Sequence, residues 1–205
     1  LRDGPLTREE AETVRALAER HLAGEPVAYL IGEWAFYGLP LTVTPAVLIP
    51  RVDTEVLAGE AIAFLEAQGP CRVLDLCAGS GCVGLALADQ VPACRVVLGE
   101  LSTEALEVCG ENVRRCGLEN RAEVRRLDAL RPPPEDLGRF SCIVCNPPYI
   151  PDGDIPDLDG SVRDFEPHMA LRGGADGLDF YRAIVRDWRR VLLPGGRLYF
   201  EVGIG

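Results

Sequence analysis

A chain of 205 residues that is 47% hydrophobic can form one α/β domain with its own core and a small appendage. Its formal net charge of −11, with arginine as every one of its 21 basic residues and no basic stripe, lacks the electrostatic footprint of a general nucleic-acid binder. Because no run approaches the roughly 20 apolar residues that cross a bilayer, and because we find neither a secretory signal nor a lipidation motif, we expect a cytoplasmic protein without a membrane partner.

The first third of the chain predicts two helices separated by a β-hairpin. Residues 7–23 carry apolar residues at helical spacing, and Thr7 with the glutamate three positions later matches a capping box. Residues 27–49 contain short strand-like pieces, which we interpret as a β-hairpin that turns near Gly38. A second amphipathic helix is predicted over 53–68.

Strands and helices alternate from residue 72 onwards. Strands are predicted over 72–79, 94–101, 122–129, 139–148 and 197–205, and helices over 83–90, 102–117 and 179–193. Ser102 is the predicted N-cap of the helix over 102–117. This alternation predicts a parallel sheet with right-handed crossovers, whose ligands bind beyond the carboxyl ends of the strands. Residues 151–166, with six Asp or Glu and few large apolar residues, are predicted to be a long mobile loop, and residues 194–196 a turn.

The eight cysteines lie mostly within apolar segments, so we expect buried free thiols rather than disulfides. Cys142 and Cys145 have the spacing of a redox or zinc pair, but residues three apart in a strand point to opposite faces. There is no second cysteine pair and no histidine-rich partner site, since the only histidines are His21 and His168. We therefore predict no metal site.

The segment DLCAGSGCVG follows the first strand of the alternating region. Gly79, Gly81 and Gly84 match the G-x-G-x-x-G fingerprint of dinucleotide binding. Glu100, at the end of the second strand, stands where an acid that binds ribose hydroxyls is expected. Taken alone, this motif would also suit a nicotinamide enzyme.

Asp75 favours a different cofactor. It lies four residues before Gly79, where a carboxylate would repel a docked pyrophosphate. S-adenosylmethionine has no phosphate and carries a sulfonium and an ammonium, which a nearby acid attracts. The alternative is that Asp75 only caps backbone amides of the loop, which is compatible with either ligand. We therefore favour S-adenosylmethionine over a nicotinamide cofactor.

The stretch CIVCNPPYIP (142–151) ends the fourth strand of this region with Asn-Pro-Pro-Tyr. Asn146 offers a carbonyl acceptor, and the Pro147 carbonyl is available because Pro148 cannot continue a helix. These two oxygens can accept both hydrogens of a planar NH2 group, while Tyr149 lies against the plane of the substrate. They would orient a weakly nucleophilic nitrogen and stabilise the charge that develops on it during methyl attack. The alternative is a proline-rich strand stop, which leaves Asn146 and Tyr149 unexplained.

Four motifs in this order resemble the HemK/PrmC family of release-factor glutamine methyltransferases. They are VLIPRVDTE (47–55), VLDLCAGSG (73–81), CNPPYIP (145–151) and FEPHMALRGGADGLDFYRAI (165–184). The resemblance implies the α/β, Rossmann-like class I S-adenosylmethionine-dependent methyltransferase fold. It also implies the end of an N-terminal helical domain over 1–26, a β-hairpin linker over 27–52 and a methyltransferase domain over 53–205 that lacks its final strands. Since residue 1 is Leu, we expect the chain to begin inside a longer gene product.

The same resemblance implies an activity. A methyl group would pass from S-adenosylmethionine, leaving S-adenosylhomocysteine, to the side-chain amide nitrogen of the glutamine in the Gly-Gly-Gln motif of class 1 peptide-chain release factors, with no direct nucleic-acid partner. Three alternatives stay open: a methyltransferase for exocyclic amines of adenine or guanine in nucleic acid, a catalytically dead cofactor-binding partner of another methyltransferase, and a nicotinamide oxidoreductase.

Site residues follow from the matching motifs. The resemblance assigns cofactor binding to Cys77, Ala78, Gly79, Ser80, Gly81, Glu100, Asp128, Ala129 and Asn146. It assigns substrate binding to Asn146, Pro147, Pro148 and Tyr149, with Asn146, Pro147 and Tyr149 as catalytic residues. Glu100 would hold the ribose hydroxyls, and Asp128 and Ala129 would lie near the adenine. The chain departs from the family pattern at Cys77, where glycine is common, and at Glu100, where aspartate is frequent.

Overall fold

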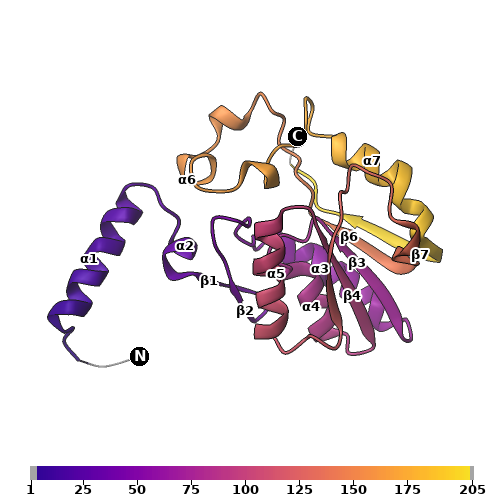
Figure 1. Cartoon of the computed structure of the whole chain (residues 1–205), viewed down its shortest axis with the longest axis horizontal. Helices are drawn as coiled ribbons and strands as arrows, with labels where there is room; N and C mark the ends of the chain where they lie inside the picture. The colour runs from indigo at the N-terminus through magenta and orange to yellow at the C-terminus, as the bar shows by residue number, and fades with distance from the viewer. Residues whose placement is uncertain (1–3, 204–205) are drawn as a thin grey trace.

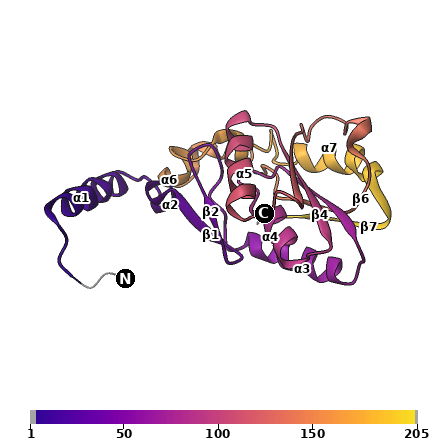
Figure 2. The ribbon, with the colours of Figure 1, turned by 60° about the horizontal axis from the view of Figure 1, so that its bottom comes forward.

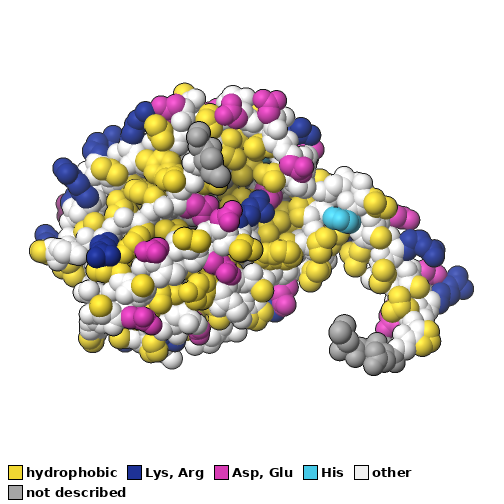
Figure 3. Space-filling view, turned by 180° about the vertical axis from the view of Figure 1, so that it is seen from behind, with side chains coloured by type: hydrophobic (Ala, Val, Ile, Leu, Met, Phe, Trp, Pro, Cys, Tyr) yellow, Lys and Arg dark blue, Asp and Glu magenta, His cyan; other side chains and the backbone are white. Residues whose placement is uncertain are grey.

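The computed structural model describes residues 4–203 and divides them into an N-terminal arm and a larger body built on a sheet (Figure 1). The arm begins with α1 (Arg8–Leu22), where Thr7 and Glu10 form the predicted capping box. α1 buries none of its residues, and both ribbon views show it extending away from the sheet (Figure 1 and Figure 2). The space-filling view from behind shows hydrophobic side chains on the surface of this arm (Figure 3). Within residues 4–203, no helix is long and apolar enough to cross a membrane.

The segment after the arm differs from the prediction at its start. Strand-like pieces were expected from residue 27, but α2 (Val27–Ile31) is a short helix. Pro26 stands at its N-cap, and Gly32 ends it in the left-handed conformation with a φ of 75°. These start and stop signals outweigh the β-branched composition of the segment.

The predicted β-hairpin is confirmed. β1 (Glu33–Phe36) pairs antiparallel with β2 (Leu39–Thr42). Tyr37 and Gly38 form the turn with φ values of 50° and 82°. Two consecutive positive φ values are what a two-residue type I′ hairpin requires. Phe36 and Leu41 anchor the hairpin in the core of the body.

Five parallel strands form the sheet of the body in the order β5-β4-β3-β6-β7. Their bounds are Cys71–Leu76 for β3, Cys94–Glu100 for β4, Ala122–Arg126 for β5, Phe140–Cys145 for β6 and Leu192–Phe200 for β7. The chain builds outward from β3 to β5 and then returns to place β6 on the other side of β3. The strand order therefore reverses between β3 and β6, which is where a sheet of this kind opens a ligand crevice.

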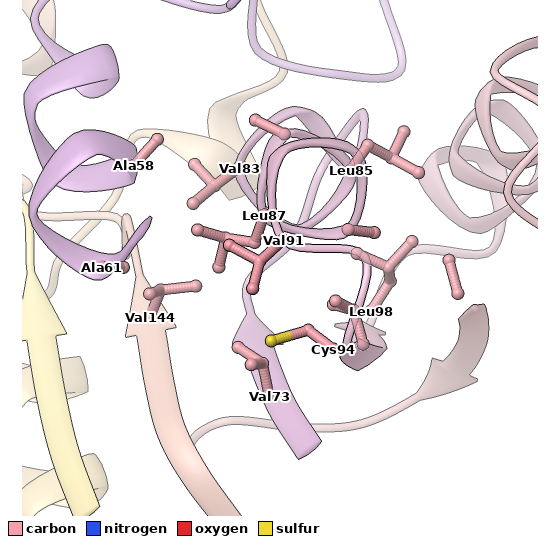
Figure 4. Packing of buried hydrophobic residues seen from close by; sticks show 14 of the residues in the cluster. Ala58, Ala61, Val73, Val83, Leu85, Leu87, Val91, Cys94, Leu98 and Val144 are labelled. Carbon is pink, nitrogen blue, oxygen red and sulfur yellow. The ribbon is translucent and has the colours of Figure 1, made fainter. Parts of the chain in front are cut away.

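Helices cover both faces of the sheet and enclose two hydrophobic clusters. One face carries α3 (Thr54–Glu66), α4 (Cys82–Gln90) and α5 (Thr103–Arg115). Figure 4 shows side chains of α3 and α4 meeting those of the strands on this face, among them Ala58, Val83 and Val144. The other face carries α7 (Asp179–Asp187) and the 3₁₀ turn Trp188–Val191, with Trp188 fully buried. The remaining short helices are α6 (Gly160–Arg163) and the 3₁₀ turns Glu135–Leu137, Ile155–Asp157 and His168–Ala170.

The cysteine prediction is confirmed. All eight thiols are free, and five of them are buried. Cys142 and Cys145 belong to the clusters on opposite faces of the sheet, as the strand geometry requires. Residues 4–203 contain no group of three or more His, Cys, Asp or Glu side chains that could hold a metal ion.

Two predicted segments are corrected. The last strand runs from Leu192 to Phe200 rather than over 197–205, so residues 194–196 lie inside it and residues 201–203 follow it. The end of that prediction, residues 204–205, lies outside the described residues. Residues 194–196 bulge because the register with β6 shifts between Phe140 and Cys142. The predicted loop over 151–166 contains a 3₁₀ turn and α6, where Asp159 caps the helix by accepting a hydrogen bond from the Ser161 amide at 2.8 Å.

Candidate active site

A pocket with a volume of about 430 Å³ lies at the carboxyl ends of β3, β4, β5 and β6. The loop after β3, the end of β4 and residues 127–130 form its walls, and residues of the linker between 46 and 51 and of the segment 167–170 complete it. The predicted site residues in its lining are Cys77, Ala78, Gly79, Ser80, Glu100, Asp128, Ala129, Asn146 and Pro148. Gly81, Pro147 and Tyr149 are not among the lining residues. The fold thus brings segments at the ends of four strands, β3, β4, β5 and β6, to one cavity.

The glycine loop is held against the sheet by close backbone contacts. The Gly84 amide, in the first turn of α4, donates a hydrogen bond of 2.8 Å to Oδ2 of Asp75. A Cβ on Gly84 would lie 2.3 Å from Cδ2 of Leu98 and 2.9 Å from Oδ2 of Asp75, so a side chain here would have to displace both of these side chains. Gly79 has a φ of 55°, and a Cβ there would meet no atom within 4 Å. The loop therefore presents open backbone at Gly79.

Asp75 is a buried acid, only 2% exposed, that also lines the pocket. Burial raises its pKa from 3.8 to about 7, the hydrogen bond from Gly84 opposes this shift, and the charge of Glu100 adds to it. Asp75 therefore does what the alternative interpretation proposed, since it caps a backbone amide. It also stands where a cation in the pocket would favour its ionised form.

Glu100 ties the glycine loop to the start of α5. Its Oε2 accepts a hydrogen bond of 2.9 Å from the Gly79 amide. Its Oε1 accepts hydrogen bonds from the amides of Leu101 and Ser102, at 2.7 Å and 2.9 Å. Ser102 in turn caps α5, as predicted, by accepting a hydrogen bond from the Ala105 amide. The carboxylate thus fixes the loop and still lines the pocket.

Asp128 and Ala129 form the wall beyond the end of β5. Oδ1 of Asp128 accepts a hydrogen bond of 2.9 Å from the Leu130 amide, which closes a tight turn. The Ala129 carbonyl accepts a hydrogen bond of 3.0 Å from Nε1 of the buried Trp188. Trp188 therefore holds this wall in place from the face of the sheet that carries α7.

Asn146 projects from the end of β6 into the wall of the pocket. Its Nδ2 donates a hydrogen bond of 3.3 Å to Oγ1 of Thr54, which is 2% exposed. Because the amide nitrogen is engaged in this way, Oδ1 is left as the acceptor of this side chain. Pro147 and Pro148 are buried directly after it. The arrangement presents a fixed acceptor next to the cofactor loop.

Tyr149 lies behind the pocket rather than in its lining. Burial raises the pKa of its hydroxyl, and the charge of Glu201 raises it further. Glu201 follows β7, and its amide donates a hydrogen bond of 3.1 Å to the Cys145 carbonyl, directly before Asn146. Within residues 4–203, Oε2 of Glu201 is buried without a hydrogen-bond partner. A carboxylate therefore lies beside the Asn-Pro-Pro-Tyr stretch.

The linker and the segment 167–170 are joined above the pocket by Glu166. This residue is 4% exposed, and its Oε2 accepts a hydrogen bond of 3.2 Å from the Ile49 amide. Its other oxygen pairs with the Arg51 guanidinium, which lines the pocket. The hydroxyl of Tyr29 on α2 donates a hydrogen bond of 2.7 Å to the Val47 carbonyl. We call linker residues 46–51 together with residues 167–170 the roof.

Sequence reasoning did not assign a role to Thr54, Arg51 or Glu166. Thr54 and Arg51 lie within VLIPRVDTE, and Glu166 lies within FEPHMAL, so two of the four quoted motifs contain them. The sequence offered little to distinguish Glu166, since it lies in an acidic segment that was predicted to be a mobile loop. Only the fold shows that this one acid is buried and paired across 115 residues.

The chain was compared with known protein families. The family described as PrmC N-terminal domain matches residues 1–32, and the family described as Methyltransferase small domain matches residues 59–157. Among solved structures, the catalytic domain of hMettl16 in complex with the MAT2A 3′UTR hairpin 6 has a TM-score of 0.60 at 19% identity, covering 82% of this chain and 63% of that one. TrmN from Thermus thermophilus has a TM-score of 0.50 at 26% identity, covering 70% of this chain and 36% of that one. These likenesses confirm the predicted class I methyltransferase fold.

Curated relatives cover nearly the whole chain. The release factor glutamine methyltransferase of Geobacter sulfurreducens is 45% identical over 203 residues, which are 99% of this chain and 69% of that protein. The protein of the same name from Bradyrhizobium diazoefficiens is 41% identical over 206 residues, covering 98% of this chain and 67% of that protein. The match runs through the arm, the linker and the pocket. The chain belongs to the release factor glutamine methyltransferase family.

Proposed function

We propose that this chain transfers a methyl group from S-adenosylmethionine to the side-chain amide nitrogen of the glutamine in the Gly-Gly-Gln motif of class 1 peptide-chain release factors. The observation that carries the proposal is the position of Asn146. Asn146 lines the same pocket as the glycine loop and Glu100, and because its Nδ2 donates to Thr54, its Oδ1 is left as an acceptor. An acceptor for a planar NH2 group therefore adjoins a site suited to a cationic nucleoside. Membership of the family agrees with this chemistry.

The residues of the pocket fit this cofactor. Gly79 leaves room for a close approach, because a Cβ there would meet nothing within 4 Å. Asp75 supplies negative charge for a cation, and Glu100 supplies carboxylate oxygens at the end of β4 that can accept from ribose hydroxyls. Asp128 and Ala129 would flank the adenine, and Cys77 through Gly81 would carry the rest of the loop contact. When bound, S-adenosylmethionine supplies an electrophilic methyl group.

The chain's own residues then position the substrate nitrogen. Oδ1 of Asn146 and the carbonyl of Pro147 would accept the two hydrogens of the glutamine amide, and Thr54 keeps Asn146 in the orientation that presents this oxygen. The attacking nitrogen would acquire positive charge, which the two fixed acceptors would stabilise. It would lose one proton to solvent after the methyl transfer, so no strong base is required. Pro148 would contact the substrate from the wall, and Tyr149 would pack behind its plane.

Cofactor choice is tested first, by titrating the chain calorimetrically with S-adenosylmethionine and with NAD. We expect binding of S-adenosylmethionine alone, because Asp75 disfavours a pyrophosphate. Binding of NAD without S-adenosylmethionine would end the proposal.

We also propose that the domain boundaries lie after residues 26 and 52, and that the protein is cytoplasmic.

Substrate choice is tested by incubating the chain with labelled cofactor and four acceptors in parallel. These are a class 1 release factor, the same factor with the motif glutamine replaced by asparagine, ribosomal RNA and DNA. We expect label only in the unaltered release factor. Label in RNA or DNA would retain the methyl-transfer chemistry and overturn the protein substrate. Label in the asparagine variant would show that the site does not discriminate between glutamine and the shorter asparagine.

A further inference from the structure

Asn112 on α5 joins the hairpin to the glycine loop through a single side chain. It is completely buried. Its Nδ2 donates hydrogen bonds to the Thr42 carbonyl at 3.0 Å and to the Ser80 carbonyl at 2.9 Å. Its Oδ1 accepts a hydrogen bond of 2.7 Å from the Thr42 amide. Both amide hydrogens and the oxygen are therefore engaged with backbone groups of two separate segments.

The two segments that Asn112 joins belong to different parts of the pocket. Ser80 belongs to the loop that lines the pocket, and it lies between Gly79, held by Glu100, and the first turn of α4. Thr42 ends β2, and the linker that follows it forms the roof of the pocket. A displacement of the loop would move the Ser80 carbonyl, and a displacement of the roof would pull on Thr42. Asn112 is the direct polar connection between them.

Satisfying backbone groups is the simplest role for a buried amide, and Asn112 does satisfy the amide and carbonyl of Thr42. That role does not require a third bond to the glycine loop. The neighbouring Glu111 offers a comparison, since its Oε1 accepts a hydrogen bond of 3.2 Å from the Thr42 hydroxyl on the surface. Glu111 thus holds the same hairpin residue, while the loop contact belongs to Asn112.

We propose that Asn112 is a positioning residue that couples the hairpin to the glycine loop, so that cofactor bound on the loop orders the linker that receives the substrate. The effect on the substrate rests on the proposed function, whereas the coupling itself rests on the hydrogen bonds above. Occupation of the loop should restrain Ser80, then Asn112, and then Thr42. The roof would then be ordered before the release factor binds.

The test begins with the unaltered chain. Hydrogen exchange is followed by mass spectrometry with and without S-adenosylhomocysteine, which binds without reacting. We expect the product to slow exchange in peptides spanning residues 39–43 at least threefold, because the Thr42 amide is bonded to Asn112. Unchanged exchange in the hairpin, at saturating ligand that protects the glycine loop, would overturn the proposal without need of any variant.

Three variants then assign the coupling. Asn112→Ala removes all three bonds, and Asn112→Asp keeps the size and one acceptor but places a carboxylate against two carbonyls. Glu111→Ala is the control, since it removes one surface hydrogen bond of the Thr42 hydroxyl, which still accepts a hydrogen bond of 3.2 Å from Arg115. We expect the dissociation constant for S-adenosylhomocysteine to rise at least tenfold in both Asn112 variants, with hairpin protection lost, and to stay within twofold in Glu111→Ala. An Asn112 variant that folds and keeps the original constant and protection would contradict the proposal.

These outcomes separate the inference from the proposed function. A chain that binds no cofactor fails both. A chain that binds cofactor and protects its loop but not its hairpin fails the inference alone. A chain that shows the coupling but methylates RNA instead of a release factor fails only the proposed function.

Discussion

The cofactor side and the substrate side of the pocket are held together by different means. On the cofactor side, Asp75 and Glu100 accept hydrogen bonds from backbone amides of the glycine loop and its neighbours. On the substrate side, Asn146 is oriented by the side chain of Thr54, and the roof is joined by the pair of Arg51 and Glu166. The cofactor side thus presents backbone groups that several side chains fix together, whereas the substrate side presents a side chain that a single neighbour orients. Changes on the two sides should therefore affect different measured quantities.

The largest effect is expected at Asn146. Asn146→Ala should lower turnover on the order of a hundredfold or more, because it removes a preorganised acceptor for charge that develops on the nitrogen. Cofactor affinity and thermal stability should change little. Steady-state kinetics with a release factor, run with calorimetry on the same preparation, checks this.

Asn146→Asp sharpens the test at the same position. It keeps the size and one acceptor but adds a charge near the methyl donor, so cofactor binding should hold while turnover falls. If either variant methylates a release factor at the unaltered rate, Asn-Pro-Pro-Tyr is only a structural stop.

Glu100 tests the cofactor side. Glu100→Ala should weaken cofactor binding by about 1.5–3 kcal/mol, because hydrogen bonds to a charged group are lost. A cofactor analogue that lacks the ribose 2′-hydroxyl separates a ribose role from a loop role. If Glu100 binds ribose, this analogue should bind more weakly than the cofactor to the unaltered chain and equally to the variant. An equal loss of affinity for the two ligands on substitution would limit Glu100 to holding the loop.

The roof should respond to Arg51→Ala with a loss of about 2 kcal/mol in the free energy of unfolding. Removal of Arg51 leaves the Glu166 carboxylate buried without its charged partner, and we expect less than the full cost of a broken buried pair because the Arg51 side chain is 38% exposed. Urea denaturation measures the change. Arg8→Ala is the matched control, since its pair with Glu12 on α1 is fully on the surface. Equal stability of the two variants would mean that the roof pair contributes nothing.

The smallest effect is a pH dependence set by Asp75. Its folded pKa of about 7 lies above its ordinary value of 3.8, so the folded state binds the proton more tightly than the unfolded state. Its contribution to stability is thus fully present below pH 3.8 and is lost as the pH rises through 7. A cationic ligand favours the ionised acid, so the affinity for S-adenosylmethionine should rise by no more than about tenfold in total between pH 6 and 8.

Proton release reports this linkage directly. Calorimetry in two buffers of different ionisation enthalpy should show release of a fraction of a proton on binding of S-adenosylmethionine at pH 7. S-adenosylhomocysteine has no sulfonium charge and should release less. Asp75→Asn keeps an acceptor for the Gly84 amide and should abolish the difference between the two ligands. If this variant releases as many protons as the unaltered chain when S-adenosylmethionine binds, the titrating group lies elsewhere.

The sequence could predict features that depend on neighbouring residues, but not those that depend on distant ones. The glycine loop, the Ser102 cap and the type I′ hairpin depend on neighbours within a few residues, so local patterns were enough to predict them. Glu166 was predicted to be part of a long mobile loop, because its partners lie in the linker, more than a hundred residues away. Asn112 looked like an ordinary helical residue, since its three hydrogen bonds reach two distant segments. Residues 194–196 do interrupt regular strand pairing, as a turn would, but they form a bulge within a strand that pairs with β6.

The two glycines that frame the loop differ in the changes they can accept over evolutionary time. At Gly84 the obstacle is a neighbour, since a Cβ would lie 2.3 Å from Leu98 and 2.9 Å from a carboxylate oxygen of Asp75. Drift to alanine there would need both the Leu98 and the Asp75 side chains to move away. At Gly79 no neighbour stands in the way, and the obstacles are the positive φ and the ligand itself. A descendant that no longer needed its cofactor would be free to lose Gly79, by way of Asn or Asp, long before it could lose Gly84.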